Sequence, residues 1–591
     1  MCGIAGFLHQ GMLASSRDLS SAFAISLSHR GPDHIGEHTF NYGCILNTRL
    51  SIIDLAGGNQ PFYSENKKIA VVQNGEIYNF VEVRESLKVE GIQFDTSSDT
   101  EVILRAYEKY GLDFVQHLNG MFSIAIIDHG TNKLHLVRDR LGVKPLFFYQ
   151  GDSIFAFSSE IKSFLEISNF KKEINQQSIY HYLNFNYVPL PQTVFKNVFH
   201  VKPGHCVSVN FQNLEVEEKC YWDLANTPEV NKPELETMEK LEYLIEDATR
   251  IRLRSDVPIG AFLSGGLDSS LVCALMKKKF NYSPETFTVG FKEAQFDESV
   301  YAKQLADFLG LKNDIVNMSS QAVEKWSELT WFNDQPHGDI SFIPTYMVAK
   351  EAAKKFKVVF SGDGGDEAFG GYIKYLDLID EAELGKKYFE GISLFSEFKT
   401  DYTKLLTSEF LEQIEIGSSF ELFQAQNEKF ENKDIINQGI LFDVKNLLPG
   451  NNLVKPDRMA MANSLEVRSP LLDYRIFELM FDLPGNLKIS KELGTKHLLK
   501  KLALKYLPEN LVYRKKQMFT VPVGEWFKGP LNKYLVEHLL CSRFTEVGIF
   551  REAELKNMIN DHTAGHKNYT RELRAILNLK LWFDQFIIGD A

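Results

Sequence analysis

The chain has 591 residues, of which 44% are hydrophobic and 24% are charged. This composition is typical of a globular protein and excludes a disordered chain, a collagen-like repeat and a coiled coil. At about 150 residues per domain the length corresponds to roughly four domains, and because some large folds run longer we expect two or three. The 65 basic and 78 acidic side chains give a net charge of −13, which argues against a nucleic-acid-binding protein.

The cysteines and the apolar segments indicate a reducing compartment and no membrane span. Six cysteines are scattered without CxxC spacing, which predicts neither a disulfide framework nor a thiolate zinc site. The N-terminal residues carry no basic segment followed by an extended apolar run, so they do not resemble a secretory signal. Because no stretch approaches the roughly 18 apolar residues of a membrane helix, we expect a soluble, cytoplasmic protein that does not bind membranes.

Short apolar runs separated by turn residues predict a strand-rich, mixed α+β first half. Two such runs cover 68–73 and 133–138, and the first is followed by the turn-forming pair Asn74-Gly75. The sequence becomes polar over 215–236, and helical spacing is more frequent after it.

This change in composition divides the chain. We predict a first domain over 1–210, a linker over 211–235 and a second domain over 236–591.

In the second half, apolar runs at 260–263, 286–289 and 357–360 alternate with helical patterns. Such alternation predicts an α/β domain with a parallel sheet, and ligands are expected at the carboxyl ends of its strands. The segment 372–443 has apolar residues at helical spacing and no recognisable motif, so we interpret it as helical packing.

Cys2 is a candidate nucleophile. A small second residue normally permits removal of the initiator methionine, which would place a thiol and a free α-amine on one residue. An α-amine has a pKa near 8, so much of it is neutral at physiological pH and can accept the thiol proton. Taken alone, a cysteine at position 2 could equally be accidental or a packing residue.

Further motifs follow Cys2 in order along the chain, and together they favour a nucleophilic Cys2 over an accidental or packing cysteine. They are 1–7 (MCGIAGF), 29–33 (HRGPD), 49–54 (RLSIID), 74–79 (NGEIYN), 98–99 (SD), 138–145 (RDRLGVKP) and 159–162 (SEIK). This series resembles the glutaminase domain of class II glutamine amidotransferases. The resemblance implies an N-terminal-nucleophile (Ntn) hydrolase sandwich that releases ammonia from glutamine. We interpret 29–33 as a turn without a catalytic role.

The resemblance also implies a set of glutamine-binding residues, which comprises Arg49, Ile52, Asn74, Gly75, Glu76 and Asp99. Arg49 can clamp the α-carboxylate in bidentate fashion. Asp99 can pair with the α-ammonium, and Glu76 can help to hold that end. The oxyanion formed when Cys2 attacks the amide would be stabilised by the Asn74 side chain and the Gly75 N–H.

The segment 263–270 (LSGGLDSS) lies between a predicted strand and a predicted helix, where backbone N–H groups and the helix dipole favour an anion. It has neither the spacing of a Walker loop nor that of a dinucleotide fold. The segment resembles the pyrophosphate loop of N-type ATP pyrophosphatases, which implies that ATP is split into AMP and pyrophosphate in a Rossmann-like α/β domain with a helical C-terminal part.

A second loop, 361–372 (SGDGGDEAFGGY), matches the asparagine synthetase family, as do 187–191, 202–205, 454–461 and 464–473. The resemblance implies an ATP site formed by Leu263, Ser264, Gly265, Gly266, Asp268, Ser269, Val289, Ser361 and Gly362. It places Asp363 near the acceptor and gives Lys496 a charge-stabilising role in adenylation. Asp268 and Asp366 are predicted Mg²⁺ ligands, because Mg²⁺ typically takes one or two carboxylates together with phosphate oxygens.

The sequence departs from the family at Asn313-Asp314, at Gln335 and at Met518. These departures bear on the acceptor more than on the reaction. We therefore expect a glutamine- and ATP-dependent ligase that amidates a carboxylate, with aspartate as the default acceptor, and the family resemblance suggests a homodimer.

The alternatives are an amidotransferase acting on a sugar acid, a peptide or a secondary metabolite, an intramolecular amide-forming cyclase, and a catalytically silent scaffold. The presence of the glutaminase motif argues against the cyclase. The presence of Cys2, Asp268 and Lys496 argues against the scaffold.

Overall fold

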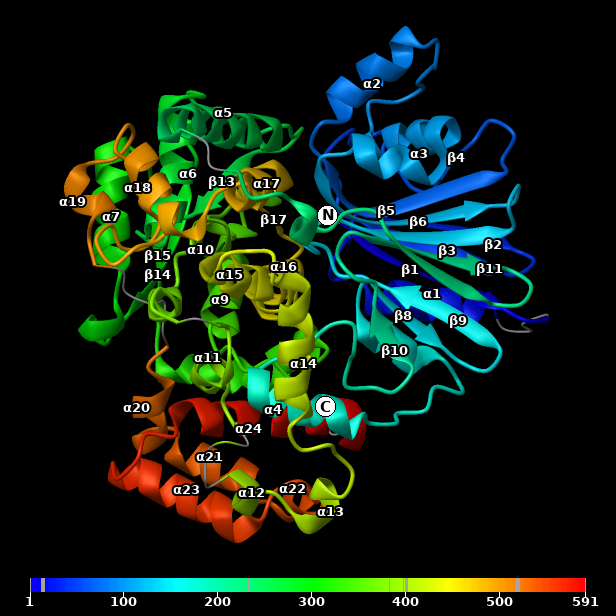
Figure 1. Ribbon diagram of the computed structural model, residues 1–591. Coiled ribbons are helices and arrows are strands. Elements are labelled where there is room, and N and C mark those ends of the chain that lie inside the picture. The colour runs from blue at the N-terminus through cyan, green and yellow to red at the C-terminus, as the bar shows by residue number, and fades with distance from the viewer. Residues whose placement is uncertain are drawn as a thin grey trace.

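The computed structural model describes residues 2–11, 16–230, 233–381, 383–396, 398, 402–515 and 521–589. Its first half, at the right of Figure 1, contains two stacked antiparallel sheets of six strands each. The first sheet has the order β10-β8-β9-β1-β3-β2, and the second has the order β12-β11-β7-β6-β5-β4. The strands of the first sheet are β1 (Cys2–His9), β2 (His34–Phe40), β3 (Gly43–Arg49), β8 (Phe147–Gln150), β9 (Ile154–Ser158) and β10 (Val198–His200). Those of the second are β4 (Phe62–Tyr63), β5 (Ile69–Ile77), β6 (Gly120–Asp128), β7 (Lys133–Arg138), β11 (His205–Asn210) and β12 (Val216–Cys220).

Helices cover the outer faces of both sheets. Apolar residues of β1, β3, β5, β6 and β9 meet between the sheets and exclude water from the centre. On the outer face of the second sheet, α3 (Asp99–Tyr110) buries Val102 and Ile103 beside α2 (Phe80–Val89). The outer face of the first sheet is covered by α1 (Ser16–Ser26) and α4 (Gln176–Phe185). The four layers confirm the predicted Ntn-hydrolase sandwich.

Two local expectations for this half were wrong. Asn74-Gly75 is not a turn but the continuation of β5, where Gly75 pairs with Phe122. A Cβ atom at Gly75 would lie 2.1 Å from the Met121 carbonyl oxygen, so the glycine serves a close approach of two strands. The polar stretch that predicted a linker over 211–235 includes β12, whose exposed charged side chains belong to an edge strand paired with β11.

The second half contains the predicted parallel sheet, in the order β15-β14-β13-β16-β17. Its strands are β13 (Ile259–Phe262), β14 (Thr286–Phe291), β15 (Asn313–Met318), β16 (Val358–Phe360) and β17 (Glu466–Arg468). The strand β13 leads into α6 (Leu267–Lys278), and β16 leads into α10 (Gly365–Phe369). Because all strands run the same way, both connecting loops meet at one edge of the sheet.

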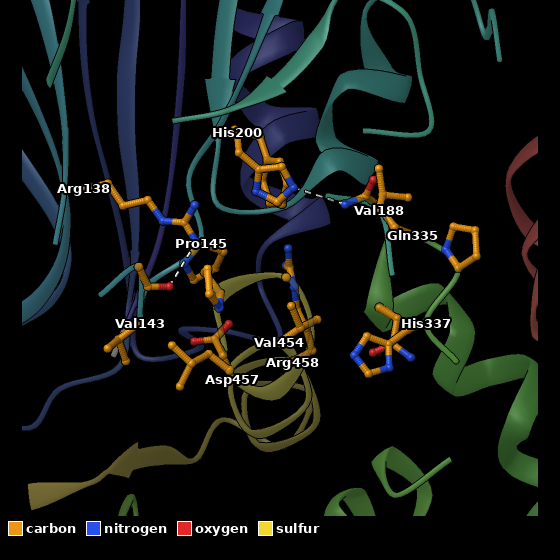
Figure 2. Close-up of a pocket in the computed structure, with 17 residues that line it drawn as sticks. Arg138, Val143, Pro145, Val188, His200, Gln335, His337, Val454, Asp457 and Arg458 are labelled. Atoms are coloured by element: carbon orange, nitrogen blue, oxygen red, sulfur yellow. Dashed lines mark hydrogen bonds between the residues drawn. The ribbon is translucent and has the colours of Figure 1, made fainter. Parts of the chain in front are cut away.

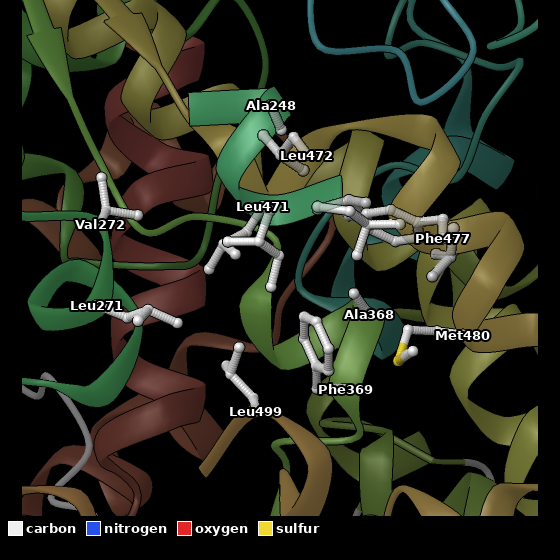
Figure 3. Close-up of a cluster of buried hydrophobic side chains, with 14 of the residues drawn as sticks. Ala248, Leu271, Val272, Ala368, Phe369, Leu471, Leu472, Phe477, Met480 and Leu499 are labelled. Carbon is white, nitrogen blue, oxygen red and sulfur yellow. The ribbon is translucent and has the colours of Figure 1, made fainter. Parts of the chain in front are cut away.

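A buried apolar cluster supports these loops from below, as Figure 3 shows. Leu271 and Val272 on α6 pack with Ala368 and Phe369 on α10 and with Leu499 on α18 (His497–Ala503). The helices α5 (Glu234–Arg252) and α17 (Tyr474–Phe481) close the cluster. The position of the loops is therefore fixed by apolar packing on several helices.

The remaining helices include the predicted helical segment 372–443, which forms several short helices as expected. They are α7 (Ser299–Leu309), α8 (Trp326–Asn333), α9 (Phe342–Ala352), α11 (Lys386–Ile392), α12 (Tyr402–Leu405), α13 (Ser408–Leu411), α14 (Ser418–Asn427), α15 (Ile435–Lys445), α16 (Val454–Met461), α19 (Glu509–Val512), α20 (Val523–Lys528), α21 (Asn532–Leu539), α22 (Ser542–Thr545), α23 (Glu552–Ala564) and α24 (Thr570–Phe583). None of the described helices is both long and apolar enough to cross a membrane.

Buried charges join the two halves. The guanidinium of Arg30, which is fully buried, donates to Glu160 (2.8 Å) and to both carboxylate oxygens of Asp457 on α16 (2.9 and 3.1 Å). Lys144 lies 3.4 Å from the same Asp457 carboxylate. Burial alone would raise the pKa of Asp457, but the charges of Arg30 and Lys144 outweigh it and lower the pKa. The segment 29–33, interpreted as a turn, thus also supplies a main contact between the halves.

We predict that Asp457→Asn lowers the free energy of unfolding by about 3–5 kcal/mol, because it leaves buried cations without their counter-charge. The matched control is Glu351→Gln, which breaks an exposed pair with Lys354 and should cost less than about 1 kcal/mol. Thermal and urea denaturation of both variants measure the difference. Equal transition midpoints for the two variants would contradict the prediction.

Candidate active sites

Cys2 lies at the first position of β1, directly opposite Arg49 at the end of β3. Its backbone N–H donates to the Oδ1 atom of Asn74 (3.3 Å). Only 5% of the residue is exposed, and burial raises the pKa of the thiol, while N–H donors of Leu50 and Asn47 act in the opposite direction. The sequence-predicted nucleophile therefore lies in a shielded site with hydrogen-bond donors around its sulfur.

Asn74 and Gly75 follow one another on β5, beside Cys2. The Asn74 Nδ2 atom lies 3.4 Å from the Ser159 hydroxyl, and the same hydroxyl accepts from the Ile4 N–H of β1 (3.0 Å). Ser159, a residue of the 159–162 motif, thus holds the amide of Asn74 against the strand that begins with Cys2. The role of Asn74 and Gly75 as oxyanion donors stays a prediction.

The guanidinium of Arg49 faces the loop that follows β3. It donates to the carbonyl oxygens of Ile53 (3.0 Å), Asp54 (2.7 Å) and Leu55 (3.3 Å) and to the side chain of Asn59 (2.7 Å). Ile52, in the same loop, is buried. These contacts fix the direction of the guanidinium, and its binding of a substrate carboxylate stays a prediction.

Glu76, on β5, and Asp99, at the start of α3, are buried carboxylates. Asp99 accepts from the Gln73 amide (2.8 Å) and from the Ile77 N–H (3.0 Å). Burial raises the pKa of Asp99; for Glu76, burial and then the charge of Glu466 raise the pKa well above its usual range. The Oε2 atom of Glu76 is buried and has no hydrogen-bond partner among the described residues. The structure thus places Arg49 and Asn74 beside Cys2 and brings the charge of Asp99 close to Glu76.

The second site lies where the loops after β13 and β16 meet. Ser264 and Ser269 bond to each other through their hydroxyls (3.1 Å), and Gly265 has a left-handed φ of +71°. A Cβ atom at Gly362 would lie 2.4 Å from the backbone nitrogen of Ser269, so the two loops touch there and require a glycine. Leu263 is buried and Val289 half-buried next to this contact.

Lys496 joins the two predicted metal ligands. Its Nζ atom lies 2.6 Å from an Asp268 oxygen and 2.8 Å from an Asp366 oxygen. Although burial disfavours its charge, these two carboxylates raise the pKa of Lys496. One cationic group contacts both carboxylates, so the two lie close enough together to share a cation; their binding of Mg²⁺ stays a prediction. Among the described residues no three His, Cys, Asp or Glu side chains form a complete metal site.

Sequence reasoning gave no role to Glu367, which is buried in the segment 361–372. Glu367 accepts from Tyr372 (2.6 Å) and from Asn452 (2.6 Å), and burial followed by the charge of Asp366 raises the pKa of Glu367 to about 7. The pKa of Asp363 is also raised, by burial. The family motif 361–372 contains Glu367 but gave it no role, and no motif included Asn452.

Two further contacts were also missed. Lys455 bonds to Asp339 and to the Ser341 hydroxyl, both at 3.0 Å. Arg514 donates to the Gly265 carbonyl oxygen from two nitrogens (3.1 and 2.9 Å) and pairs with Glu298 (2.8 Å). No motif in the sequence pointed to Arg514.

The departures from the family pattern have different surroundings. The Asn313 side chain accepts from the hydroxyls of Thr286 and Thr288 on the neighbouring strand, so it is part of the sheet. Asp314 is paired with Lys355 on the surface (2.9 Å). Gln335 bonds to the Val194 N–H (3.0 Å) at the interface of the two halves. Met518 lies outside the described residues.

Two cavities lie between the halves of the chain. Figure 2 shows the larger one, where Arg138, Pro145 and His200 of the first half face Gln335, His337 and Arg458 of the second. The smaller cavity is lined by the following residues of both halves: Tyr78, Gly120, Met121, Asp139, Arg140, Leu141, Val143, Arg252, Ser469, Leu472 and Tyr474. Val143 borders both.

The smaller cavity extends from β6 of the first half toward the loop that begins at Ser361. Gly120 and Met121 lie on β6 opposite Ile77 and Glu76. At the other side, the Ser469 hydroxyl donates to the Asp363 carbonyl oxygen (2.6 Å). This cavity therefore lies between the two predicted reaction centres.

Comparison with known proteins agrees with this arrangement of two sites. A family model described as a glutamine amidotransferase domain matches residues 1–222, and one described as asparagine synthase matches residues 240–584. The chain is 32% identical to "Asparagine synthetase [glutamine-hydrolyzing] 1" of Bacillus subtilis over 618 aligned residues. The alignment covers 98% of this chain and 96% of that protein. The chain belongs to the glutamine-hydrolysing asparagine synthetase family, and it is an ATP-dependent amidating ligase.

Other relatives carry different names. A putative glutamine-hydrolysing asparagine synthetase of Methanocaldococcus jannaschii is 36% identical over 64% of this chain and 76% of its own. "Amidase chry2" of Gibberella zeae is 28% identical over 93% of both chains. Sequence similarity alone therefore does not determine the acceptor.

Proposed function

We propose that this chain transfers the amide nitrogen of glutamine to the side-chain carboxylate of aspartate, with ATP split into AMP and pyrophosphate. The observation that carries the proposal is the assembly of Arg49, Asn74, Glu76 and Asp99 around Cys2, in a chain whose other half presents the loops after β13 and β16. The product pair is asparagine and glutamate.

The glutaminase step begins at Cys2. After removal of the initiator methionine, the α-amine of Cys2 takes the thiol proton, and the sulfur attacks the amide carbon of glutamine. Asn74 Nδ2 and the Gly75 N–H stabilise the oxyanion. The proton passes to the leaving nitrogen, ammonia departs, and water hydrolyses the thioester to glutamate.

The synthetase step activates the acceptor. Its carboxylate oxygen attacks the α-phosphorus of ATP, and pyrophosphate leaves; the Ser264–Ser269 loop and the Ser361–Gly362 loop hold the phosphates. Asp268 and Asp366 would bind Mg²⁺, which neutralises phosphate charge. Lys496 stabilises charge at the α-phosphate. Ammonia then attacks the acyl carbon, gives up a proton, and AMP leaves.

The two predicted amino-acid sites each offer one cation and two carboxylates. Glutamine meets Arg49 and the buried carboxylates of Glu76 and Asp99. Around the predicted acceptor site, Lys455 can bind a carboxylate if it exchanges its partner Asp339 for the substrate, while Asp363 and Glu367 suit an ammonium group. Both charges of an α-amino acid thus find a counterpart, which favours aspartate over a sugar acid. The proposal keeps a second acceptor class open, because an amidase is among the relatives.

We also propose a cytoplasmic location, since the predicted nucleophile is a thiol that a reducing compartment keeps free. A homodimer is retained from the family resemblance. We propose two domains: the second covers 236–591, and the first extends beyond the predicted 1–210 to include β12.

The experiment that tests the function is pyrophosphate release from purified protein with Mg²⁺-ATP and glutamine. Aspartate is compared with other amino acids, sugar acids and short peptides, and with no acceptor. We expect aspartate alone to stimulate pyrophosphate release and to yield asparagine. The Cys2→Ala variant should lose the reaction with glutamine and keep the reaction with ammonium salts. Stimulation by a different carboxylate, with none by aspartate, would overturn aspartate as acceptor.

Glutamine binding should weaken as the pH falls. The pKa values of Glu76 and Asp99 are raised, so these carboxyl groups become protonated at a higher pH than usual and then lose their attraction for the substrate ammonium. Equilibrium binding of glutamine to the Cys2→Ala variant at several pH values measures this without turnover. Glu76→Gln should flatten the dependence, whereas Glu82→Gln, which removes a carboxylate paired with Arg254, should leave it unchanged. A Kd independent of pH down to the ordinary glutamate value of 4.5 would contradict the prediction.

We propose that ammonia crosses between the sites through the smaller cavity. Neutral ammonia is nucleophilic, whereas ammonium is not, so a path sheltered from water preserves it. The substitution Leu141→Phe fills this cavity and should lower the yield of amide product per glutamine hydrolysed several-fold, while synthesis from ammonium salts continues. The matched control is Val454→Phe, which fills only the larger cavity. Loss of coupling in the control and not in Leu141→Phe would assign the path to the larger cavity instead.

A further inference from the structure

The motif 464–473 matches the family pattern, but the sequence assigned no function to it. In the structure one of its residues, Arg468, contacts a predicted glutamine-binding residue. Its residues 466–468 form β17, the edge strand of the parallel sheet, which lies beside the glutaminase half in Figure 1. The register pairs Phe360 with Arg468. One end of this strand therefore adjoins the loop that begins at Ser361.

The side chain of Arg468 points to the glutamine site. It is fully buried, and its Nε donates to Glu466 (2.5 Å). Its Nη1 donates to the carbonyl oxygens of Arg252 (2.8 Å) and Arg254 (2.6 Å). Its Nη2 lies 3.4 Å from the Oε1 atom of Glu76. One guanidinium thus spans from the sheet of the second half to a predicted glutamine-binding residue of the first.

The main chain of the same segment holds the ATP loop. The carbonyl oxygen of Arg468 accepts from the Ser361 N–H (2.9 Å), and the hydroxyl of Ser469 donates to the Asp363 carbonyl oxygen (2.6 Å). A displacement of Arg468 along or across the sheet would therefore move hydrogen-bond partners of the ATP loop directly.

The charges at Arg468 depend on what occupies the glutamine site. Two buried carboxylates, Glu76 and Glu466, share this one guanidinium, at 3.4 and 2.5 Å. The Oε2 atom of Glu76 has no hydrogen-bond partner among the described residues. An ammonium group that binds Glu76 supplies a second cation and weakens the attraction of Glu76 for Arg468. Glu466 and the two carbonyl oxygens then remain as the partners of Arg468. The balance of forces on β17 thus differs between the empty and the filled site.

We propose that Arg468 is a positioning residue that couples occupancy of the glutamine site to the geometry of the ATP loop. The inference rests on the proposed function, because it takes glutamine as the ligand at Glu76 and ATP as the ligand at Ser361. Its consequence is mutual: ATP binding changes the affinity for glutamine, and glutamine changes the affinity for ATP by the same factor.

The test is a binding cycle on the full-length Cys2→Ala protein, in which glutamine is not consumed. The Kd of glutamine is measured with and without saturating Mg²⁺-ATP, in the absence of any acceptor carboxylate. We expect a change in Kd of about fivefold or more, as is usual for coupled sites. With Arg468→Lys added, the ratio of the two Kd values should fall to about one, because a lysine keeps the charge but cannot contact Glu76, Glu466 and both carbonyls together.

The matched control is Arg254→Lys. Arg254 pairs with Glu82 (2.5 Å) at the same interface, and its substitution leaves the main-chain acceptor of Arg468 in place. A merely structural role for Arg468 would lower the unfolding midpoint and leave the ratio of Kd values unchanged, and this result would overturn the proposal. The proposal would also be overturned if ATP had no effect on the binding of glutamine to the Cys2→Ala protein.

Glu76→Gln provides the second variant, in case Arg468→Lys does not fold. It should weaken glutamine binding and reduce the coupling, while the Kd of ATP measured alone is unchanged. Full coupling in Glu76→Gln would refute the role of Arg468. Failure of the proposed function would give different results: the Cys2→Ala protein would bind no glutamine, and no carboxylate would stimulate pyrophosphate release.

Discussion

The arrangement of both sites depends on buried charges at the interface between the two halves of the chain. Arg30 and Arg468 are both fully buried, and each contacts carboxylates on both sides of the interface. Buried ion pairs contribute little net stability, but removing one partner is costly, so they act mainly against alternative docking geometries. A sliding of one half against the other would leave several of these charges unpaired. The relative position of Cys2 and the ATP loop is therefore restricted by electrostatics as well as by apolar packing.

The parallel sheet supplies the second restriction. Since its strands share one direction, the loops after β13 and β16 meet at a single edge, and the contact of Gly362 with Ser269 fixes their spacing. The helices that carry Leu271, Phe369 and Leu499 support both loops from one apolar cluster. Lys496 extends from this supported region to Asp268 and Asp366. The site thus needs little rearrangement of backbone to accept a phosphate-bearing ligand.

The sequence predicted elements whose signal is local. The strand–helix alternation identified β13, β14 and β16, and the ordered motifs identified Cys2 and its neighbours. The Asn74-Gly75 pair was misread because a glycine that permits close strand contact has the same identity as one that permits a turn. The strand β12 was misread because an exposed edge strand is as polar as a linker. The contact of Arg30 with Asp457 joins residues 427 positions apart, and no periodicity reports such a contact.

Residue type alone also failed to predict protonation. Glu76, Asp99 and Glu367 are acidic side chains whose pKa is raised because the fold buries them, whereas Asp457 is equally buried and has a lowered pKa because Arg30 and Lys144 lie beside it. The difference lies in the number of cations that each carboxylate contacts. At the sites where a substrate ammonium is expected, the protein supplies fewer cations than carboxylates, so the ligand itself completes the charge balance. At the interface between the halves the protein supplies the cations, and the same chemistry there serves to hold the structure together.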